Sequence, residues 1–261
     1  MTPQLLAGRV TVITGGSNGI GRATAILFAQ HGAHVTVGDI DQMPENEEAF
    51  QNLGIRSETC DVREPEALRR LMDGAASAFG RLDILVNNAG VGMVKQIDAV
   101  SEEDWDKCLD TNLKGPFFAC KAAIPWMIKS GGGSIINVAS NAGLLPRAHD
   151  PVYSISKGAV VALTKSLGLC HAKDKIRVNA ICPGPVERTR MLETDLLQHA
   201  DPAAARRQLL EASPLVRAHG RLITPEEVAQ AALYLASDAA IMVSGTSLAI
   251  DGGKSLGVPG K

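Results

Sequence analysis

Aromatic residues, excess charge of either sign and long apolar runs are all scarce in this chain of 261 residues. Phe, Trp and Tyr together make up 3%, whereas hydrophobic residues as a whole make up 45%. A core of aliphatic side chains suits parallel strands buried between helices better than a β-sandwich. The formal net charge of -2 gives no electrostatic reason to expect nucleic acid or an anionic membrane as a partner.

Paired cysteines and targeting segments are also missing. The five cysteines are scattered without a C-x-x-C pair, which favours reduced core thiols over a disulfide framework or a zinc site. No spacing of His, Cys, Asp and Glu indicates a catalytic metal. Residues 1–16 lack the pattern of a signal peptide, and no stretch approaches the 18 apolar residues of a membrane span. We therefore expect a cytoplasmic protein without a metal.

Short β-prone apolar runs alternate with amphipathic helical patterns along the chain. The expected strands are Arg9–Thr14, His34–Asp39, Arg56–Asp61, Ile84–Asn87, Gly133–Val138, Arg177–Ile181 and Ser247–Ile250. The expected helices are Gly21–His31, Pro65–Phe79, Ser101–Gly131, Pro151–Lys173 and Pro225–Ala236. This alternation implies parallel strands joined by right-handed crossovers. The sequence predicts an α/β fold in a single domain, 1–261, with a doubly wound parallel sheet of about seven strands.

One segment breaks the alternation. Glu187–Leu222 is rich in charge, Leu and Ala, and it follows a Pro-Gly-Pro sequence. We interpret residues 187–222 as a helical insertion and a candidate substrate lid. Two helix starts are marked by caps, namely Ser101 with an acidic residue three positions on, and Thr224 before Pro225.

A glycine-rich turn joins the first strand to the next helix. In Thr14–Gly21 (TGGSNGIG) the glycines allow a tight turn close to a pyrophosphate, and the helix N-terminus offers free N–H donors. Glycine at a strand–helix junction is also found for purely structural reasons, so this motif alone does not establish dinucleotide binding. Asp39 ends the second strand, where a carboxylate binds ribose hydroxyls and repels a 2′-phosphate. No arginine follows Asp39 and Asn18 is not basic, which favours NAD over NADP.

With these features the chain resembles the short-chain dehydrogenase/reductase family over essentially its whole length. The matching motifs are Thr14–Gly21, Asp61-Val62, Asn87-Asn88-Ala89-Gly90, Asn112, Ser140, Tyr153-x-x-x-Lys157 and Pro183-Gly184, in the usual order and spacing. The resemblance implies a Rossmann fold and a nicotinamide cofactor. The cofactor-binding residues it implies are Gly15, Ser17, Asn18, Gly19, Ile20, Asp39, Asp61, Val62, Asn88, Ala89, Gly90, Tyr153, Lys157, Pro183, Gly184, Val186 and Thr189.

The resemblance also implies the catalytic residues. Tyr153 and Lys157 are four apart on an expected helix and share one face. Tyrosine has a pKa near ~10 in water, and a nearby ammonium is expected to lower it. In the family's mechanism Tyr153 exchanges the alcohol proton, and Lys157 also binds the nicotinamide ribose. Ser140 holds the substrate oxygen, and Asn112 bends its helix and holds a water that links the lysine to solvent.

At the nicotinamide end the sequence departs from the family. The family commonly has threonine five residues after the proline of Pro183-Gly184, where it contacts the carboxamide. Here Arg188 occupies that position and Thr189 follows. Either the loop is shifted by one residue, or Thr189 and the backbone of Val186 share the contact.

The segments expected to contact substrate are polar. Five of their residues are candidate substrate ligands, namely Asn141, Arg147, His149, Arg188 and Arg190. They favour a hydroxyl-rich or anionic small molecule, such as a sugar, sugar acid or hydroxy acid. The opposing interpretation is that these arginines are solvated, as charged side chains usually are. In that case a hydrophobic hydroxy or keto compound, of steroid or acyl type, remains open as substrate.

Other classes of function are weighed by what they would require. A non-catalytic dinucleotide-binding protein could lose Ser140, Tyr153 or Lys157, yet all three are present. An NADPH-dependent carbonyl reductase would carry basic residues at position 18 or just after Asp39. A sugar epimerase or dehydratase would need a larger C-terminal domain. The resemblance finally implies a homo-oligomer, most often a tetramer.

Overall fold

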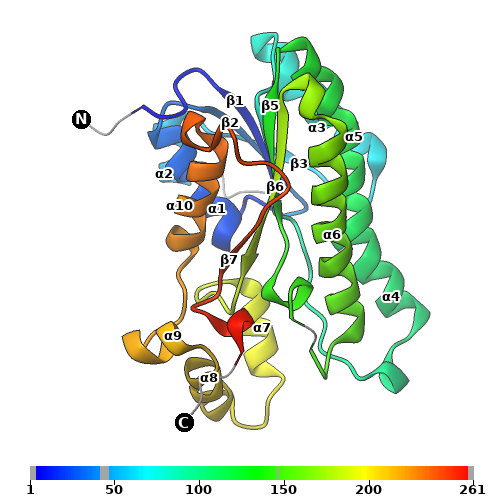
Figure 1. The fold of residues 1–261 in the computed structure, drawn as a ribbon, viewed down its shortest axis with the longest axis vertical. Coiled ribbons are helices and arrows are strands. Elements are labelled where there is room, and N and C mark those ends of the chain that lie inside the picture. Colours follow the sequence, from blue (N-terminus) through cyan, green and yellow to red (C-terminus); the bar gives the residue numbers. More distant parts are fainter. Residues whose placement is uncertain (1–3, 42–46, 146, 258–261) are drawn as a thin grey trace.

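The computed structural model describes residues 4–41, 47–145 and 147–257, and these form a parallel seven-stranded sheet between two layers of helices (Figure 1). The strand order is β3-β2-β1-β4-β5-β6-β7, and each neighbouring pair is parallel. The strands are β1 Val10–Thr14, β2 His34–Asp39, β3 Arg56–Thr59, β4 Ile84–Asn87, β5 Gly133–Val138, β6 Ile176–Pro183 and β7 Ser247–Ile250. The predicted doubly wound α/β fold is confirmed.

The helices cover both faces of the sheet. Their bounds are α1 Gly19–Gln30, α2 Glu48–Leu53, α3 Pro65–Phe79, α4 Glu102–Leu109, α5 Gly115–Lys129, α6 Pro151–Cys170, α7 Arg190–Leu197, α8 Pro202–Glu211, α9 Pro214–His219 and α10 Pro225–Ala236. Helices α1 and α10 lie on one face, and α3, α5 and α6 lie on the other (Figure 1). Each layer has its own apolar core, with Phe28 and Leu235 in one and Leu68 and Met127 in the other.

The strand order reverses between β2 and β4, which both pair with β1. In the register, Thr14 lies opposite Gly38 on one side and opposite Asn87 on the other. The carboxyl ends of β1, β2 and β4 therefore meet at one edge of the sheet. In doubly wound sheets ligands bind at such a switch point, outside the carboxyl ends of the strands.

Several predicted boundaries need correction. The helix expected over 101–131 is interrupted by a π-helical turn, Asp110–Lys114, between α4 and α5. The strand expected over 56–61 ends at Thr59, because β3 is an exposed edge strand. Strand β6 runs beyond its predicted limits at both ends, and α6 ends at Cys170. The six-residue helix α2 was not predicted, and both predicted caps, at Ser101 and Thr224, form capping boxes.

The insertion 187–222 contains three short helices, α7, α8 and α9. In Figure 1 they gather at the lower end of the molecule, where β6 and β7 end. The insertion is joined to the sheet domain by a parallel bridge between Val186 and Ile223. It therefore lies beside the sheet edge at which a ligand is expected. Among the described residues, no helix combines the length and apolar character needed to cross a membrane.

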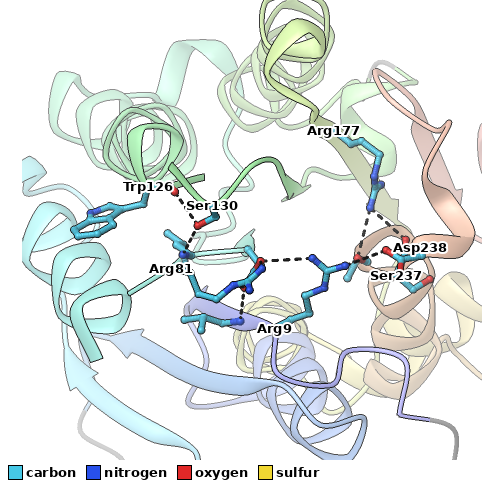
Figure 2. Close-up of polar contacts among 11 residues, drawn as sticks. Arg9, Arg81, Trp126, Ser130, Arg177, Ser237 and Asp238 are labelled. Atoms are coloured by element: carbon cyan, nitrogen blue, oxygen red, sulfur yellow. Dashed lines mark hydrogen bonds and ion pairs between the residues drawn. The ribbon is translucent and has the colours of Figure 1, made fainter. Parts of the chain in front are cut away.

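A polar network holds the opposite, amino-terminal edge of the sheet together (Figure 2). Asp83, just before β4, is 3% exposed and binds both Arg81 (2.9 Å) and Arg9 (3.5 Å). Arg9 also pairs with Asp238 at 3.2 Å, and Arg177 donates to carbonyl groups at the C-terminal end of α10. The network joins β1, β4, β6 and α10 at the edge away from the carboxyl ends of the strands.

Candidate active site

The glycine-rich turn after β1 is packed too tightly for side chains. Gly15 has φ +68°, and a Cβ there would lie 2.7 Å from the Ala89 Cα. A Cβ on Gly21 would lie 2.1 Å from the Gly15 carbonyl oxygen. The Asn88 amide donates to the carbonyls of Gly15 (2.6 Å) and Thr14 (3.2 Å). The segment Asn88–Gly90 thus holds the turn in place.

The N-terminus of α1 has the features of an anion site. Asn18 is the N-cap residue, but its side chain makes no cap hydrogen bond, and the first turn carries no acidic residue. Gly19 has φ +53°, which brings the backbone into the turn without a side chain in the way. Backbone N–H groups at a helix N-terminus and the helix dipole favour phosphate. Gly15, Asn18, Gly19 and Ile20 therefore fit the pyrophosphate of a dinucleotide.

At the end of β2 the Asp39 carboxylate is 7% exposed and is directed to the glycine-rich turn. It accepts hydrogen bonds from the Ser17 amide (2.9 Å) and hydroxyl (2.6 Å), and from the Asp41 amide (3.1 Å). A carboxylate can accept up to about four hydrogen bonds, so one position remains for a ribose hydroxyl. Asp39 and Ser17, predicted separately as cofactor ligands, form one unit.

Beyond β3, Asp61 and Val62, both predicted to bind the cofactor, differ in environment. Asp61 forms a bidentate ion pair with Arg63, and this hydrogen bonding lowers the pKa of the Asp61 carboxyl. Arg63 thus donates to both carboxylate oxygens of Asp61, a contact that the sequence analysis did not predict. Val62 is buried and packs closely against Gly115, where an added Cβ would lie 3.1 Å from the Val62 Cβ.

Ser140, Tyr153 and Lys157 converge at the carboxyl ends of β5 and β6, and all three are buried. Ser140 follows β5, and its hydroxyl accepts from the Ala142 amide at 3.1 Å. Tyr153 and Lys157 lie one turn apart on α6, with the lysine Nζ 5.8 Å from the centroid of the tyrosine ring. The Lys157 Nζ donates to the Val138 carbonyl at 3.0 Å.

Burial shifts the pKa values of Tyr153 and Lys157. Burial raises the pKa of the Tyr153 phenol, against opposing effects of a hydrogen bond from Ser140 and of the Arg147 charge. Burial also lowers the pKa of Lys157, from 10.5 to about 8. Burial is the largest cause of both shifts, because desolvation disfavours the charged form of each group. The expectation that Lys157 lowers the pKa of Tyr153 stays a prediction.

The lowered pKa of Lys157 makes stability depend on pH. In the unfolded chain Lys157 keeps its proton up to about pH 10.5, whereas in the folded protein it loses the proton near pH 8. Between these values the unfolded state binds more protons, so the free energy of unfolding rises with pH. Relative to Lys157→Met, the wild-type protein should gain about 2 kcal/mol between roughly pH 7.5 and 9.5 in urea unfolding without cofactor. The same pH slope in both proteins would contradict this. The raised pKa of Tyr153 destabilises the fold only above about pH 10, outside that window.

Asn112 lies in the π-helical turn and is completely buried. Its side-chain oxygen accepts from the Val91 amide (2.8 Å), and its nitrogen donates to the Val91 carbonyl (3.0 Å) and the Ser156 hydroxyl (3.1 Å). A Cβ on Gly90 would be 3.2 Å from the Asn112 oxygen and 3.4 Å from the Lys157 Nζ. Asn112, in the π-helical turn, and Lys157, on α6, therefore both approach Gly90.

After β6 the chain leads into the insertion 187–222. The Gly184 amide donates to the Ile250 carbonyl at 3.0 Å, and Val186 is buried. Thr189 is the N-cap residue of α7, and its hydroxyl donates to the Val186 carbonyl at 2.9 Å. Its methyl group packs against the glycine-rich turn, where a Cβ added to Gly19 would lie 3.1 Å away. Arg188 has φ +56° and forms an ion pair with Glu226 at 2.5 Å. Thr189, not Arg188, lies against the glycine-rich turn.

The predicted substrate residues separate into two groups. Asn141 and Arg147 lie beside Tyr153: their side chains are joined at 2.9 Å, and the guanidinium carbon is 5.7 Å from the centroid of the tyrosine ring. The other three contact residues elsewhere. His149 is exposed and bonds to Gln96, Arg188 pairs with Glu226, and Arg190 pairs with Asp41 near the end of β2.

Met191 was not among the individual residues predicted to contact substrate. Its sulfur lies 4.0 Å from the Tyr153 hydroxyl, and its Cγ would be 3.0 Å from a Cβ on Gly92. Met191 thus brings the insertion 187–222 to the phenol. The only available signal was its position two residues after Thr189, the cap of α7.

Comparisons with known proteins agree with this geometry. Residues 15–255 match a family described as enoyl-(acyl carrier protein) reductase. The chain is 37% identical over 252 residues to the 3-oxoacyl-[acyl-carrier-protein] reductase FabG of Thermotoga maritima, covering 95% of this chain and 98% of that protein. It is 38% identical over 254 residues to a cis-4-hydroxycyclohexanecarboxylate dehydrogenase of Sinomonas cyclohexanicum, covering 96% and 98%.

A solved structure supports the same assignment. The ligand-free aldohexose dehydrogenase of Thermoplasma acidophilum superposes with a TM-score of 0.87 at 33% identity, covering 98% of this chain and 97% of that one. These likenesses extend over the whole sheet domain and its lid. The chain is thus an oxidoreductase that belongs to the short-chain dehydrogenase/reductase family, whose members bind a nicotinamide dinucleotide.

Proposed function

We propose that this protein catalyses hydride transfer between a secondary alcohol, or a hemiacetal, and NAD. The observation that carries the proposal is the convergence of Ser140, Tyr153 and Lys157 beside the glycine-rich turn and the uncapped N-terminus of α1. A buried phenol beside an ammonium suits proton exchange with an alcohol, and the helix terminus suits a pyrophosphate. Bound NAD would supply the hydride acceptor.

The residues of the chain account for the proton and the oxygen. Tyr153, as phenolate, takes the hydroxyl proton during oxidation and returns it during reduction, so protons balance in both directions. The Ser140 hydroxyl is placed to donate to the reacting oxygen and to stabilise its developing charge. Lys157 stabilises the phenolate and lies at Gly90, where it is placed to reach the nicotinamide ribose. Pro183, Gly184, Val186 and Thr189 are proposed to hold the nicotinamide ring.

The preference for NAD rests on Asp39. A carboxylate at the end of β2 repels a 2′-phosphate and accepts from ribose hydroxyls. Arg190 of the lid reaches Asp41, two residues further on, but its charge is already paired with that carboxylate. The charge balance at the carboxyl end of β2 therefore supports NAD. The proposed cofactor site is completed by Asp61, Val62, Asn88, Ala89 and Gly90.

The polar surroundings of Tyr153 support a hydroxyl-rich or acidic substrate. Arg147 and Asn141 lie beside the phenol, and the names of two relatives specify an aldohexose and a hydroxycarboxylate as their substrates. A second candidate is the reduction of an acyl or other hydrophobic keto compound. It is favoured by Met191 at the phenol and by the FabG relative.

We also propose that the enzyme is a cytoplasmic homotetramer acting on a small molecule, without nucleic acid or membrane as partner. The four buried cysteines and the exposed Cys170 are all free thiols, which suits a reducing compartment. Helices α4, α5 and α6 expose Trp105, Phe117, Ile155 and Leu169. Large exposed apolar residues on neighbouring helices suit burial against further copies of the chain.

The test measures nicotinamide absorbance with NAD or NADP against sugars, sugar acids, hydroxy acids, secondary alcohols and steroids. We expect NAD to be reduced with a polar substrate. Asp39→Ala should lower kcat/KM for NAD by about 10- to 100-fold, because a hydrogen bond to a charged group contributes about 1.5–3 kcal/mol. Ser17→Ala is the control, since it removes the Asp39–Ser17 hydroxyl contact but keeps the carboxylate, and it should retain the preference for NAD. Turnover with NADP alone would overturn the assignment.

A further inference from the structure

Arg147 lies in the loop before α6, and two hydrogen bonds fix its side chain. The guanidinium donates to the Asp150 carboxylate at 3.0 Å and to the Asn141 side-chain oxygen at 2.9 Å. Asp150 is itself buried, and it also accepts from the Ser154 hydroxyl at 3.0 Å. The positive charge of Arg147 is therefore held in one place by residues of the same loop and of the first turn of α6.

This charge lies beside the ring of Tyr153. The guanidinium carbon of Arg147 is 5.7 Å from the centroid of the ring, and the Lys157 Nζ is 5.8 Å from the same point. Tyr153 is 7% exposed, so water screens these charges only weakly. The ring thus has two cations at nearly equal distances, and a positive charge beside it favours the phenolate over the phenol.

The hydrogen bond of Arg147 to Asn141 also affects Ser140. The Ser140 hydroxyl lies 3.4 Å from the Asn141 side-chain oxygen, to which it can donate its single hydrogen. Arg147 donates to the same oxygen at the shorter distance of 2.9 Å, and a charged donor makes the stronger bond. Because Arg147 satisfies the Asn141 oxygen, the Ser140 hydrogen is left to turn toward the phenol or the reacting oxygen.

The titratable groups that face Tyr153 come from three elements. They are Arg147 and Asp150 of the loop, Lys157 of α6 and Cys108 of α4. Burial has the largest effect on the pKa of Tyr153 and raises it; Arg147 lowers it, by more than Asp150 and Cys108 raise it individually. The pKa of Lys157 is lowered to about 8, whereas a guanidinium stays charged up to about pH 12. Arg147 is thus the cation that persists where the phenol ionises.

We propose that Arg147 is a positioning residue for proton exchange, because its fixed charge favours the phenolate of Tyr153. Its hydrogen bond to Asn141 in addition leaves Ser140 free to donate to the reacting oxygen. This inference rests on the proposed function, in which Tyr153 takes the alcohol proton. It assigns Arg147 to the residues of the enzyme and not to a charged group of the substrate. Loss of Arg147 should therefore impair the turnover of neutral and acidic alcohols alike.

The first experiment measures the ionisation of Tyr153 without any substrate. In a Tyr234→Phe background Tyr153 is the only tyrosine, so ultraviolet difference absorbance after a rapid jump to alkaline pH reports its ionisation before the chain unfolds. Arg147→Met should raise the pKa of Tyr153 by about one pH unit, the lower end of the effect of a nearby charge, because Asp150 partly offsets Arg147. Arg147→Lys should keep most of the wild-type value, because it keeps the charge.

The second experiment measures turnover with NAD as a function of pH. Its probes are a neutral and an acidic alcohol, either D-glucose with gluconate or cyclohexanol with cis-4-hydroxycyclohexanecarboxylate. At neutral pH Arg147→Met should lower kcat about tenfold for both probes and change KM less than about twofold, and the loss should shrink as the pH rises. Arg69→Met is the control, because it removes an exposed arginine of α3 that also pairs with carboxylates, and it should behave as wild type.

Three results would overturn the proposal. One is an unchanged pKa of Tyr153 in Arg147→Met, and another is an equal loss in Arg147→Met and Arg147→Lys, which would indicate a purely structural role. The third is a loss confined to KM for the acidic probe, which would mean that Arg147 binds the acid itself. Absence of turnover with any alcohol would instead contradict the proposed function, and the ionisation of Tyr153 would still decide the role of Arg147.

Discussion

Replacing Tyr153 with phenylalanine should lower kcat by about 10²- to 10⁴-fold, the usual contribution of a general acid–base group. The phenol oxygen is the group proposed to exchange the substrate proton, and it lies in a buried site beside Ser140 and Lys157. The aromatic ring itself remains, so its packing under Arg147 and Met191 is retained. NADH binding, followed by quenching of protein fluorescence, should therefore change little.

The chain offers a matched control, because it contains only two tyrosines. Tyr234 lies on α10, is 43% exposed and is not part of the proposed site. Tyr234→Phe removes the same hydroxyl and should leave turnover at the wild-type level. If Tyr153→Phe kept more than about a tenth of the activity, the assignment of the proton-exchanging group would be wrong.

Gly21→Ala should have the largest effect on folding and on cofactor binding. The added Cβ would lie 2.1 Å from the Gly15 carbonyl oxygen and 2.5 Å from the Asn88 amide nitrogen. Relief of this overlap requires the glycine-rich turn to move away from α1, which breaks the hydrogen bonds from Asn88. Overpacking of this kind costs about 1–3 kcal/mol and occasionally more, and we expect the upper end. Affinity for NADH should fall at least about tenfold.

The control for this substitution is Gly158→Ala. Gly158 lies inside α6, and a Cβ there would meet no atom within 4 Å. Alanine is favoured over glycine in a helix interior by roughly 0.5–1 kcal/mol, so this variant should be slightly more stable than wild type. Urea unfolding of both variants, with NADH titration of whatever folds, makes the comparison. An unchanged unfolding free energy for Gly21→Ala would contradict the close packing described for the turn.

Local signals in the sequence were sufficient for much of this protein. Strand positions follow from short apolar runs between turn residues, and helix starts follow from caps such as Ser101 and Thr224. The pairing of Tyr153 with Lys157 follows from a spacing of one helical turn. The glycine-rich turn follows from the need for backbone close to a phosphate. Each of these depends on residues near one another in the chain, so each could be predicted without tertiary structure.

Features that depend on distant residues could not be predicted. The π-helical turn in the middle of 101–131 accompanies the bonding of Asn112 to Val91, 21 residues away. The pKa values of Tyr153 and Lys157 are governed by burial, which the i, i+4 spacing does not reveal. The ion pair of Arg190 with Asp41 spans 149 positions in the sequence.

The fold class, the order of the strands along the chain and the residues proposed to exchange the proton could all be predicted from the sequence. Which charged side chains lie beside those residues depends on the tertiary structure. It directed Arg188 and Arg190 to carboxylates outside it and brought Met191 and Arg147 to Tyr153. The physical reason is that local geometry is encoded by neighbouring residues, whereas charge and solvent exclusion at a site are sums over the whole fold.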